Sequence, residues 1–315
     1  MLISRNHTAT TTNAFYLLVV VLLLCSLRAR SQDAVSFLKA KTVEPAADFK
    51  PVGSGNEQPF DFTRNLIFFD ASVNGEPGRF ILDTGAPTLL LNSRGEITAG
   101  HEQSSGQAAG GSVALATQRI ESFEMGGRTL AKHWALALDL RSMESRTGKR
   151  IDGYVGHKFL RGGEVRIDFP GRKFQLLRSS RFPRHAGQSP RKVLRFEYDD
   201  HLPVITVKVG KRKLRFAVDT GAGTNLIDEK YRDLMLPTGA RMNIQGLDGS
   251  NANHDIVRLF GMPCQDEDEA TNFVVMDLSH LQTYGEPPIS GILGSVFLAD
   301  HIVGIDFRRR KLYFW

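Results

Sequence analysis

Residues 80–86 read Phe-Ile-Leu-Asp-Thr-Gly-Ala, and residues 216–222 read Phe-Ala-Val-Asp-Thr-Gly-Ala. Each copy places an ionisable carboxylate, Asp83 or Asp219, at the end of an apolar run, followed by a small hydroxyl residue and a glycine. A carboxylate at the end of a buried strand is costly unless it is hydrogen-bonded or paired. Its presence in both copies indicates that the two carboxylates act together.

The repeat extends far beyond these seven residues. The two aspartates lie 136 residues apart (219 − 83). Downstream, residues 154–156 correspond to residues 292–294, and residues 167–169 correspond to residues 305–307, both at an offset of 138. Solenoid repeats have periods of about 20–50 residues. This much longer period therefore predicts two homologous lobes in one chain.

Length and charge set broad limits on the function. A chain of 315 residues has room for one large or two medium domains. The formal charge is +6, but residues 1–31 contain three arginines and no acid, so the remainder carries only +3. No stripe of basic residues alternates with aromatic ones, as nucleic-acid binding would require. We therefore expect no nucleic-acid partner.

The cysteine content argues against a disulfide framework. The chain has two cysteines, and Cys25 lies in the apolar N-terminal run. A mature domain would keep only Cys264, which can form neither an internal disulfide nor a metal cluster. The acidic run at residues 266–269 also disfavours a reactive thiolate at Cys264.

The N-terminus has the pattern of a secretory signal. Arg5 supplies the positive end, residues 15–24 form an apolar core, and small residues precede a cleavage point after Ser31. The apolar run is short for a transmembrane helix, which needs about 20 residues. We expect residues 1–31 to be a signal peptide and the protein to be periplasmic or secreted. An uncleaved N-terminal anchor in the membrane stays open as the alternative.

Two further segments lack the periodicity of a folded element. Residues 32–58 contain prolines and a Gly-Ser-Gly sequence, which is typical of a flexible leader. A pro-segment that covers the site is the other interpretation. Residues 179–193 are basic and contain two prolines, and we expect them to form a linker on the surface.

The remaining chain has the pattern of β-strands. Apolar residues alternate over residues 67–73, and Asn74-Gly75 is a strong hairpin signal before the alternation resumes toward Asp83. Residues 205–218 repeat this pattern around a turn at 210–211. No segment has a long apolar stripe of helical period. These features predict an all-β chain.

A glycine-rich stretch follows each Asp-Thr-Gly sequence. The first contains Gly110 and Gly111, and the second contains Gly246 and Gly249. They have two interpretations, as ordinary hairpin tips or as mobile flaps that close over a bound ligand.

The two Asp-Thr-Gly sequences, each followed by an apolar-apolar-glycine element, resemble the aspartic proteases. Ala86 and Ala222 make the chain look more like the retropepsin-type branch, fused into a single chain, than like pepsin. The resemblance covers residues 60–315. It implies an all-β fold with two homologous acid-protease-like β-barrel lobes, residues 59–178 and 194–315, and an active cleft between them.

The resemblance also implies roles for individual residues. Asp83 and Asp219 would be the catalytic dyad, and Thr84 and Thr220 would hydrogen-bond across the lobe interface. The residues implied to support the site are the loop residues Gly85, Ala86, Gly221 and Ala222 and the glycines beneath the loops, Gly156 and Gly294.

The chemistry of such a pair is clear from the residues. Two carboxyl groups within hydrogen-bonding distance cannot comfortably both ionise, so they share a proton and titrate together. Between their two apparent pKa values one is a base and the other an acid, which is the state needed to hydrolyse an amide with water. We expect a peptide or protein substrate, no cofactor, no metal and a monomer with an intramolecular site.

The sequence also departs from the family pattern. Pro87 follows the first Asp-Thr-Gly-Ala whereas Gly223 follows the second, so the two loops differ in backbone donors. Tyr154 replaces the aliphatic residue expected in its element, and neither glycine-rich stretch carries the flap tyrosine of pepsin-like enzymes. Neither departure removes a catalytic group, but both weaken inferences about subsites drawn from pepsin. The alternative function is a peptide-binding module that kept the cleft but lost efficient turnover, and the presence of both carboxylates argues against it.

Overall fold

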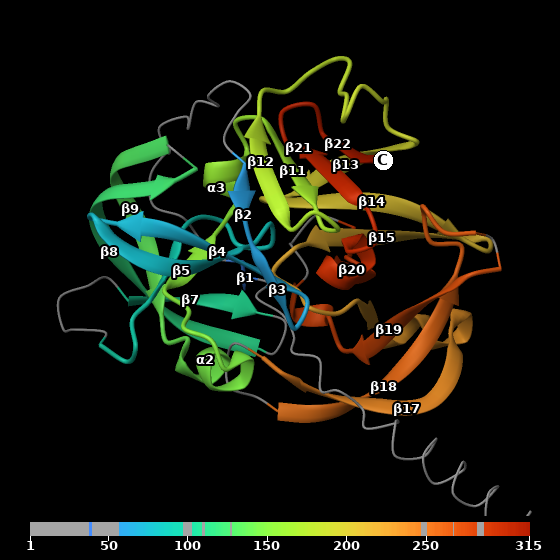
Figure 1. The fold of residues 1–315 in the computed structure, drawn as a ribbon. Helices are drawn as coiled ribbons and strands as arrows, with labels where there is room; N and C mark the ends of the chain where they lie inside the picture. Colours follow the sequence, from blue (N-terminus) through green and yellow to red (C-terminus); the bar gives the residue numbers. More distant parts are fainter. Residues whose placement is uncertain are drawn as a thin grey trace, which may run out of the picture. The chain divides into compact units, whose positions relative to one another are not determined.

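The computed structural model describes residues 38–39, 57–96, 103–108, 111–126, 128–246, 251–266, 268–281 and 287–315. The predicted signal peptide, residues 1–31, lies outside the described residues, as does most of the predicted leader. The described chain is mainly β-strand with a few short helical turns, arranged in two sheets (Figure 1). The all-β prediction is therefore confirmed.

The first sheet contains nine strands, mostly from the first copy of the repeat. Their order is β1 (Leu38–Lys39), β7 (Gln103–Ala108), β8 (Gly111–Met125), β9 (Arg128–Leu138), β6 (Leu90–Asn92), β10 (Gly153–Val155), β5 (Glu76–Leu82), β4 (Leu66–Val73) and β3 (Asp61–Thr63). An additional pairing of β4 with β8 joins the strands from β8 to β4 into a closed ring.

The second sheet contains thirteen strands. Their order is β17 (Leu236–Gln245), β18 (Asn251–Phe260), β19 (Ala270–Met276), β16 (Leu226–Asp228), β20 (Gly291–Gly294), β15 (Arg212–Asp219), β14 (Leu202–Val209), β13 (Lys192–Asp199), β22 (Lys311–Phe314), β21 (Ile302–Asp306), β11 (Glu164–Asp168), β12 (Lys173–Leu177) and β2 (Gln58–Pro59). The short helices are α2 (Arg141–Thr147), α3 (His157–Leu160), α4 (Ser295–Leu298), η1 (Glu229–Leu234) and η2 (Ser279–Leu281).

The hairpins follow the predicted pattern. Strands β4 and β5 flank Asn74-Gly75, where both residues have positive φ, as a tight hairpin turn requires. Strands β14 and β15 form the equivalent hairpin around residues 210–211. Successive side chains of a strand face opposite sides of the sheet. In β4 both sides are buried, with Ile67 and Phe69 in one apolar cluster and Leu66 and Phe68 in another.

The copies of the repeat match strand for strand around their Asp-Thr-Gly sequences. Strand β10 runs parallel to β5, with Val155 opposite Leu82, and β20 runs parallel to β15, with Leu293 opposite Val218. In both copies a third strand, β6 or β16, pairs antiparallel with the other side of β10 or β20. The apolar-apolar-glycine elements are thus the strands next to those that end at Asp83 and Asp219.

Aromatic side chains fill the core behind these strands. Phe80 packs edge-on against Phe123, and Phe123 packs in the same manner against Phe159, with ring centroids 5.4 and 4.8 Å apart. All three rings are fully buried. Edge-to-face contacts of this kind add about 0.5–1.5 kcal/mol beyond the burial of their area. This packing fixes β5 from behind while its end carries Asp83.

The copies of the repeat do not form separate sheets. Strands β11 and β12 come from residues 59–178, yet β11 pairs with β21 in the other copy (Figure 1). The linker predicted at 179–193 leads into β13, which pairs with β22 next to β21. Below, residues 59–178 are called the first half and residues 194–315 the second half.

Candidate active site

The two aspartates stand at equivalent ends of equivalent strands. Asp83 directly follows β5, and its backbone N–H donates to the Val155 carbonyl of β10 at 3.1 Å. Asp219 is the last residue of β15 and lies opposite Gly294 of β20. Both aspartate side chains are completely buried. Buried carboxyls need nearby donors, and the loops that follow provide them.

Backbone amides of the loops hold the carboxylates. Asp83 Oδ1 accepts hydrogen bonds from the N–H groups of Gly85 at 2.7 Å and Ala86 at 3.0 Å. Asp219 Oδ1 accepts one from Gly221 at 2.8 Å. The N–H of Ala222 donates to the backbone carbonyl of Asp219. Since donors stabilise the ionised form of a carboxyl, the loop amides favour the charged form of both aspartates.

Reciprocal threonine hydrogen bonds join the two loops. The Thr84 hydroxyl donates to the Val218 carbonyl at 2.9 Å, and the Thr220 hydroxyl donates to the Leu82 carbonyl at 2.8 Å. Each hydroxyl also accepts the other threonine's backbone N–H, both at 3.0 Å. All four bonds are buried and connect residues more than 130 positions apart. They bring the two Asp-Thr-Gly sequences into contact.

Close backbone approach explains three of the glycines. A Cβ on Gly85 would lie 2.5 Å from the Asp219 carboxyl oxygen Oδ1. A Cβ on Gly156 would lie 2.5 Å from the Thr88 carbonyl, and one on Gly294 would lie 2.5 Å from the Ala222 carbonyl. Real Cβ atoms essentially never come this close to another atom. The loops can thus pack on each other and on β10 and β20 only with glycine at these positions.

The carbonyls of the loop alanines continue this packing. The Ala86 carbonyl accepts the N–H of His157, the first residue of α3, at 2.8 Å. The Ala222 carbonyl accepts the N–H of Ser295, the first residue of α4, at the same distance. Each loop is therefore tied to the helical turn that follows the strand beneath it.

The electrostatic setting of Asp219 favours its protonated form. Burial raises the pKa of Asp219 and outweighs the interactions that act to lower it. Hydrogen bonding with the Asp83 side chain and with the N–H groups of Gly221 and Gly85, together with the charge of His201, acts to lower that pKa. Asp219 Oδ2 is buried without a hydrogen-bond partner among the described residues. Burial thus favours the protonated form of Asp219.

Tyr154 lies close to the two carboxyls. It is fully buried in β10, and its hydroxyl has no hydrogen-bond partner in the described part of the chain. Burial raises the pKa of the Tyr154 phenol, and the negative charges of Asp83 and Asp219 raise it further. The equivalent residue of β20 is the apolar Ile292. The phenol of Tyr154 therefore has no counterpart in the second half.

Two turns make contacts that the sequence analysis missed. Asn65, between β3 and β4, donates from Nδ2 to the Gly223 carbonyl at 2.9 Å. His201, between β13 and β14, has Nε2 2.9 Å from the Gly85 carbonyl. Each turn thus contacts the loop of the other half. A signal was present, since residues 65 and 201 are separated by the same 136 positions as the two aspartates.

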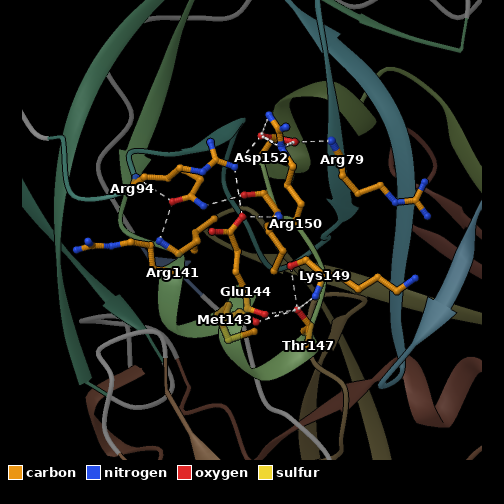
Figure 2. A network of polar contacts seen from close by, with 12 residues as sticks. Arg79, Arg94, Arg141, Met143, Glu144, Thr147, Lys149, Arg150 and Asp152 are labelled. Atoms are coloured by element: carbon orange, nitrogen blue, oxygen red, sulfur yellow. Dashed lines mark hydrogen bonds and ion pairs between the residues drawn. The ribbon is translucent and has the colours of Figure 1, made fainter.

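A polar network holds the start of β10 in place (Figure 2). The Asp152 carboxylate accepts hydrogen bonds from the Arg79 backbone N–H at 2.7 Å and from the side chains of Arg94 at 2.8 Å and Arg150 at 2.9 Å. In α2, Glu144 accepts from the backbone N–H of Ile151 at 2.9 Å. This network ties β10 to β5 just upstream of Tyr154.

The predicted flap glycines are placed only in part. Strands β7 and β8 pair antiparallel, as do β17 and β18, and each glycine-rich stretch falls between the two strands in the sequence. Gly110 and Gly249 lie outside the described residues. Gly111 begins β8, and Gly246 follows β17. A flap function of these residues stays a prediction.

Cys264 is a protonated thiol in the second half. It is partly buried, and burial raises its pKa to about 11, despite the opposing charges of Lys192 and Arg191. A thiol with such a pKa is a poor nucleophile at neutral pH. Cys264 lines a cavity of about 460 Å³ together with Asn272 and His301.

Comparison with known proteins gives a match over part of the chain. Residues 69–159 match a family model described as aspartyl protease. The matched range contains the first Asp-Thr-Gly loop and Gly156 and ends before the second loop. No curated protein matches the chain. The match supports a peptidase of the aspartic class.

Proposed function

We propose that the protein is a single-chain aspartic endopeptidase in which Asp83 and Asp219 form the catalytic dyad. The observation that carries the proposal is the reciprocal bonding of Thr84 and Thr220, which brings two buried carboxyls from distant parts of one chain together. Structural acids are rarely fully buried unless paired. Two that face each other at matched strand ends fit a shared-proton pair.

The mechanism follows from the asymmetry of the pair. Asp83, with two backbone donors, is the ionised base that takes a proton from a water molecule. The water oxygen attacks the carbonyl carbon of the scissile amide. Asp219, whose pKa is raised by burial, donates its proton to the carbonyl oxygen. Collapse of the tetrahedral species with proton transfer to the nitrogen releases the amine and the new carboxylic acid.

Substitution of either aspartate tests the dyad. We expect the wild type to cleave a mixture of denatured proteins somewhere between pH ~3 and ~7, and Asp83→Asn and Asp219→Asn each to lower the rate at least about a thousandfold. The matched control is Asp70→Asn, because the Asp70 side chain is 79% exposed; it should cleave like the wild type. Loss of activity in only one of the two dyad variants would contradict a shared proton.

The alternative function is a peptide-binding module. It is favoured by the complete burial of both carboxyls, which leaves them closed to substrate in this conformation. A module of this kind would bind a denatured-protein peptide library in a pull-down yet release no new N-termini at any pH tested. Endopeptidase activity would instead generate new N-termini that vanish in Asp83→Asn.

We further propose that the protein acts in the periplasm or outside the cell, as a monomer. The N-terminal pattern of residues 1–31 supports export. No helix among the described residues has the length and apolar character to cross a membrane. N-terminal sequencing of the mature protein should begin at Gln32, and an intact Met1 would favour the anchored alternative.

A further inference from the structure

Equivalent strands of the two halves differ at one buried position. Strand β6 pairs in parallel with β9, and β16 pairs in parallel with β19 in the matching register, which makes Leu136 equivalent to Val274. Three residues before Leu136 stands His133, and three residues before Val274 stands Thr271. A histidine of the first half is thus replaced by a smaller threonine in the second half.

The His133 ring fills a space beside the Asp-Thr-Gly loop of the first half. Its Nε2 lies 3.2 Å from the Thr88 hydroxyl, and the ring packs edge-on against Phe159 of α3, with ring centroids 5.8 Å apart. His133 is buried, and this burial, together with the charge of Lys158, lowers its pKa to about 4. The surroundings therefore hold an uncharged imidazole between a hydroxyl and an aromatic ring.

The second half repeats the hydroxyl and the aromatic ring but not the imidazole. Thr224 is the equivalent of Thr88, at the offset of the loops (224 − 88 = 136). Phe297 is the equivalent of Phe159, at the offset of the later strands (297 − 159 = 138). Thr224, Phe297 and Thr271 all line the cavity of about 460 Å³. The groups that border an imidazole in the first half therefore border a cavity in the second half.

A buried hydroxyl of this cavity lacks a partner. Thr224 is only 4% exposed, and its hydroxyl makes no hydrogen bond within the described part of the chain. The hydroxyl of Thr271, in contrast, donates to Oε1 of Gln265. Because a buried polar group without a partner is costly, a ligand nitrogen beside Thr224 would recover a hydrogen bond that the folded chain does not supply.

We propose that this cavity is a binding site for an uncharged imidazole-type ring, which hydrogen-bonds to Thr224 and packs against Phe297 as the His133 ring does with the equivalent residues. Its volume lies in the range of small-molecule sites, about 300–1,000 Å³, and leaves room for the molecule that carries the ring. Both a free small molecule and the histidine side chain of a peptide carry such a ring. Binding does not depend on the proposed peptidase function.

The cavity adjoins the strand beneath the second Asp-Thr-Gly loop. Asn225, which lines the cavity, accepts the N–H of Gly294 through Oδ1 at 3.0 Å and donates from Nδ2 to the Asn272 carbonyl at 3.1 Å. Gly294 in turn lies opposite Asp219. A bound ring would therefore occupy a cavity whose wall includes the side chain that holds Gly294 in place.

An NMR titration with 4-methylimidazole tests the site directly. The probe is the ¹³C-labelled methyl group of Met242, which lines the cavity, and the titration is run at about pH 8.5, where most of an imidazole is neutral. We expect a saturable shift with a Kd of about 1–10 mM. Thr271→His recreates the arrangement of the first half and should abolish the shift. Thr271→Val keeps the cavity open and should bind within about threefold of the wild type. Unchanged binding in Thr271→His would overturn the proposal.

A second variant and a second ligand test the hydroxyl. Thr224→Val keeps the shape of the side chain and removes its hydroxyl, so the affinity for 4-methylimidazole should fall at least about tenfold. Toluene, a methyl-bearing ring without nitrogen, should bind the wild type and Thr224→Val equally. Equal affinity of the wild type and Thr224→Val for 4-methylimidazole would overturn the proposal, whether or not Thr271→His folds.

The tripeptide Gly-His-Gly distinguishes the two sources of the ring. Binding at least about tenfold tighter than that of 4-methylimidazole would identify the histidine side chain of a peptide, because the flanking peptide groups add contacts. Weaker binding than that of 4-methylimidazole would identify a free small molecule, because the flanking groups are then excluded. Gly-Phe-Gly is the matched control and should bind less tightly than Gly-His-Gly. Failure of both 4-methylimidazole and Gly-His-Gly to shift the Met242 methyl signal would overturn the proposal.

Discussion

At the scale of single residues, identical sequence does not create identical chemistry. Both copies contain Asp-Thr-Gly-Ala, yet the N–H of Ala86 donates to the Asp83 carboxylate, whereas the N–H of Ala222 donates to the backbone carbonyl of Asp219. Burial then raises the pKa of Asp219. The difference arises from how the loops pack, since the four residues of each motif are the same. Two like carboxyls can thereby take opposite roles.

Tyr154 provides a test of stability at this scale. Its hydroxyl is buried without a partner among the described residues, which costs about 1–3 kcal/mol. Tyr154→Phe removes the hydroxyl and keeps the ring, so the free energy of unfolding should rise by about 1 kcal/mol in urea denaturation.

The matched control for that variant is Tyr198→Phe. The Tyr198 hydroxyl donates to the Phe307 carbonyl at 2.8 Å. Its removal should lower the free energy of unfolding by about 1 kcal/mol. If both variants lose stability equally, the Tyr154 hydroxyl has a partner, such as a bound water, that stabilises the folded protein.

At the scale of elements, different side chains fix equivalent strands. Asp152 precedes β10 and accepts the Arg79 backbone N–H; Ser290 precedes β20, and its Oγ accepts the Arg215 backbone N–H at 3.0 Å. The first half adds arginine side chains around Asp152 (Figure 2), whereas the second adds a hydrogen bond from Ser290 to the Tyr231 hydroxyl. The fold needs an acceptor at this position rather than a charge.

The charge of Asp152 should nevertheless appear in the pH dependence of stability. Burial acts to raise the pKa of Asp152, but the hydrogen bonds from Arg79, Arg94 and Arg150 outweigh it and lower the pKa. A carboxyl whose pKa is lowered by folding stabilises the protein fully at pH values above its unfolded-state pKa, about 3.9. This stabilisation is lost as the pH falls through the lower pKa of the folded state. Asp152→Asn should lower the free energy of unfolding by about 1 kcal/mol at pH 7.

Comparison across pH separates this effect from simple loss of a hydrogen bond. The difference between wild type and Asp152→Asn should shrink on acidification below about pH 4. Ser290→Ala removes an uncharged acceptor, so its cost should stay constant over the same range. A constant difference for Asp152→Asn would show that its charge contributes nothing.

At the scale of the whole molecule, the second sheet couples the two halves. Strand β11 pairs with β21, and β22 lies between β21 and β13. The threonine bonds and the turns at Asn65 and His201 add further links. Because neither half keeps a complete set of strand partners without the other, we expect them to unfold together.

The two tryptophans allow this to be measured. Trp134 lies in β9 of the first half, and Trp315 ends the second half, where its Nε1 donates to the Gln188 carbonyl at 3.0 Å. Trp315→Phe leaves fluorescence that reports on the first half, and Trp134→Phe leaves fluorescence that reports on the second. In each variant the fluorescence midpoint should coincide with that from far-UV circular dichroism, as two-state unfolding requires. Separate midpoints would mean that the halves are independent.

The sequence alone determined the repeat, the two Asp-Thr-Gly motifs and the all-β class. Alternation and turn chemistry act over a few residues, so β4, β5, β14 and β15 could be predicted with their turns. The duplication also indicated which carboxyls belong together, because equivalent sequences fold into equivalent strands.

Only the tertiary structure decided the contacts between the halves. Strand β11 pairs with β21, and His201 contacts the Gly85 carbonyl, although no local sequence pattern relates these residues. The burial of the Tyr154 hydroxyl is likewise a property of the folded molecule. These contacts form only when the strands of both halves have folded and packed against each other. Their favourable energy is therefore not available to either half alone. The chemical difference between Asp83 and Asp219 therefore belongs to the folded molecule, because burial and neighbouring donors set it.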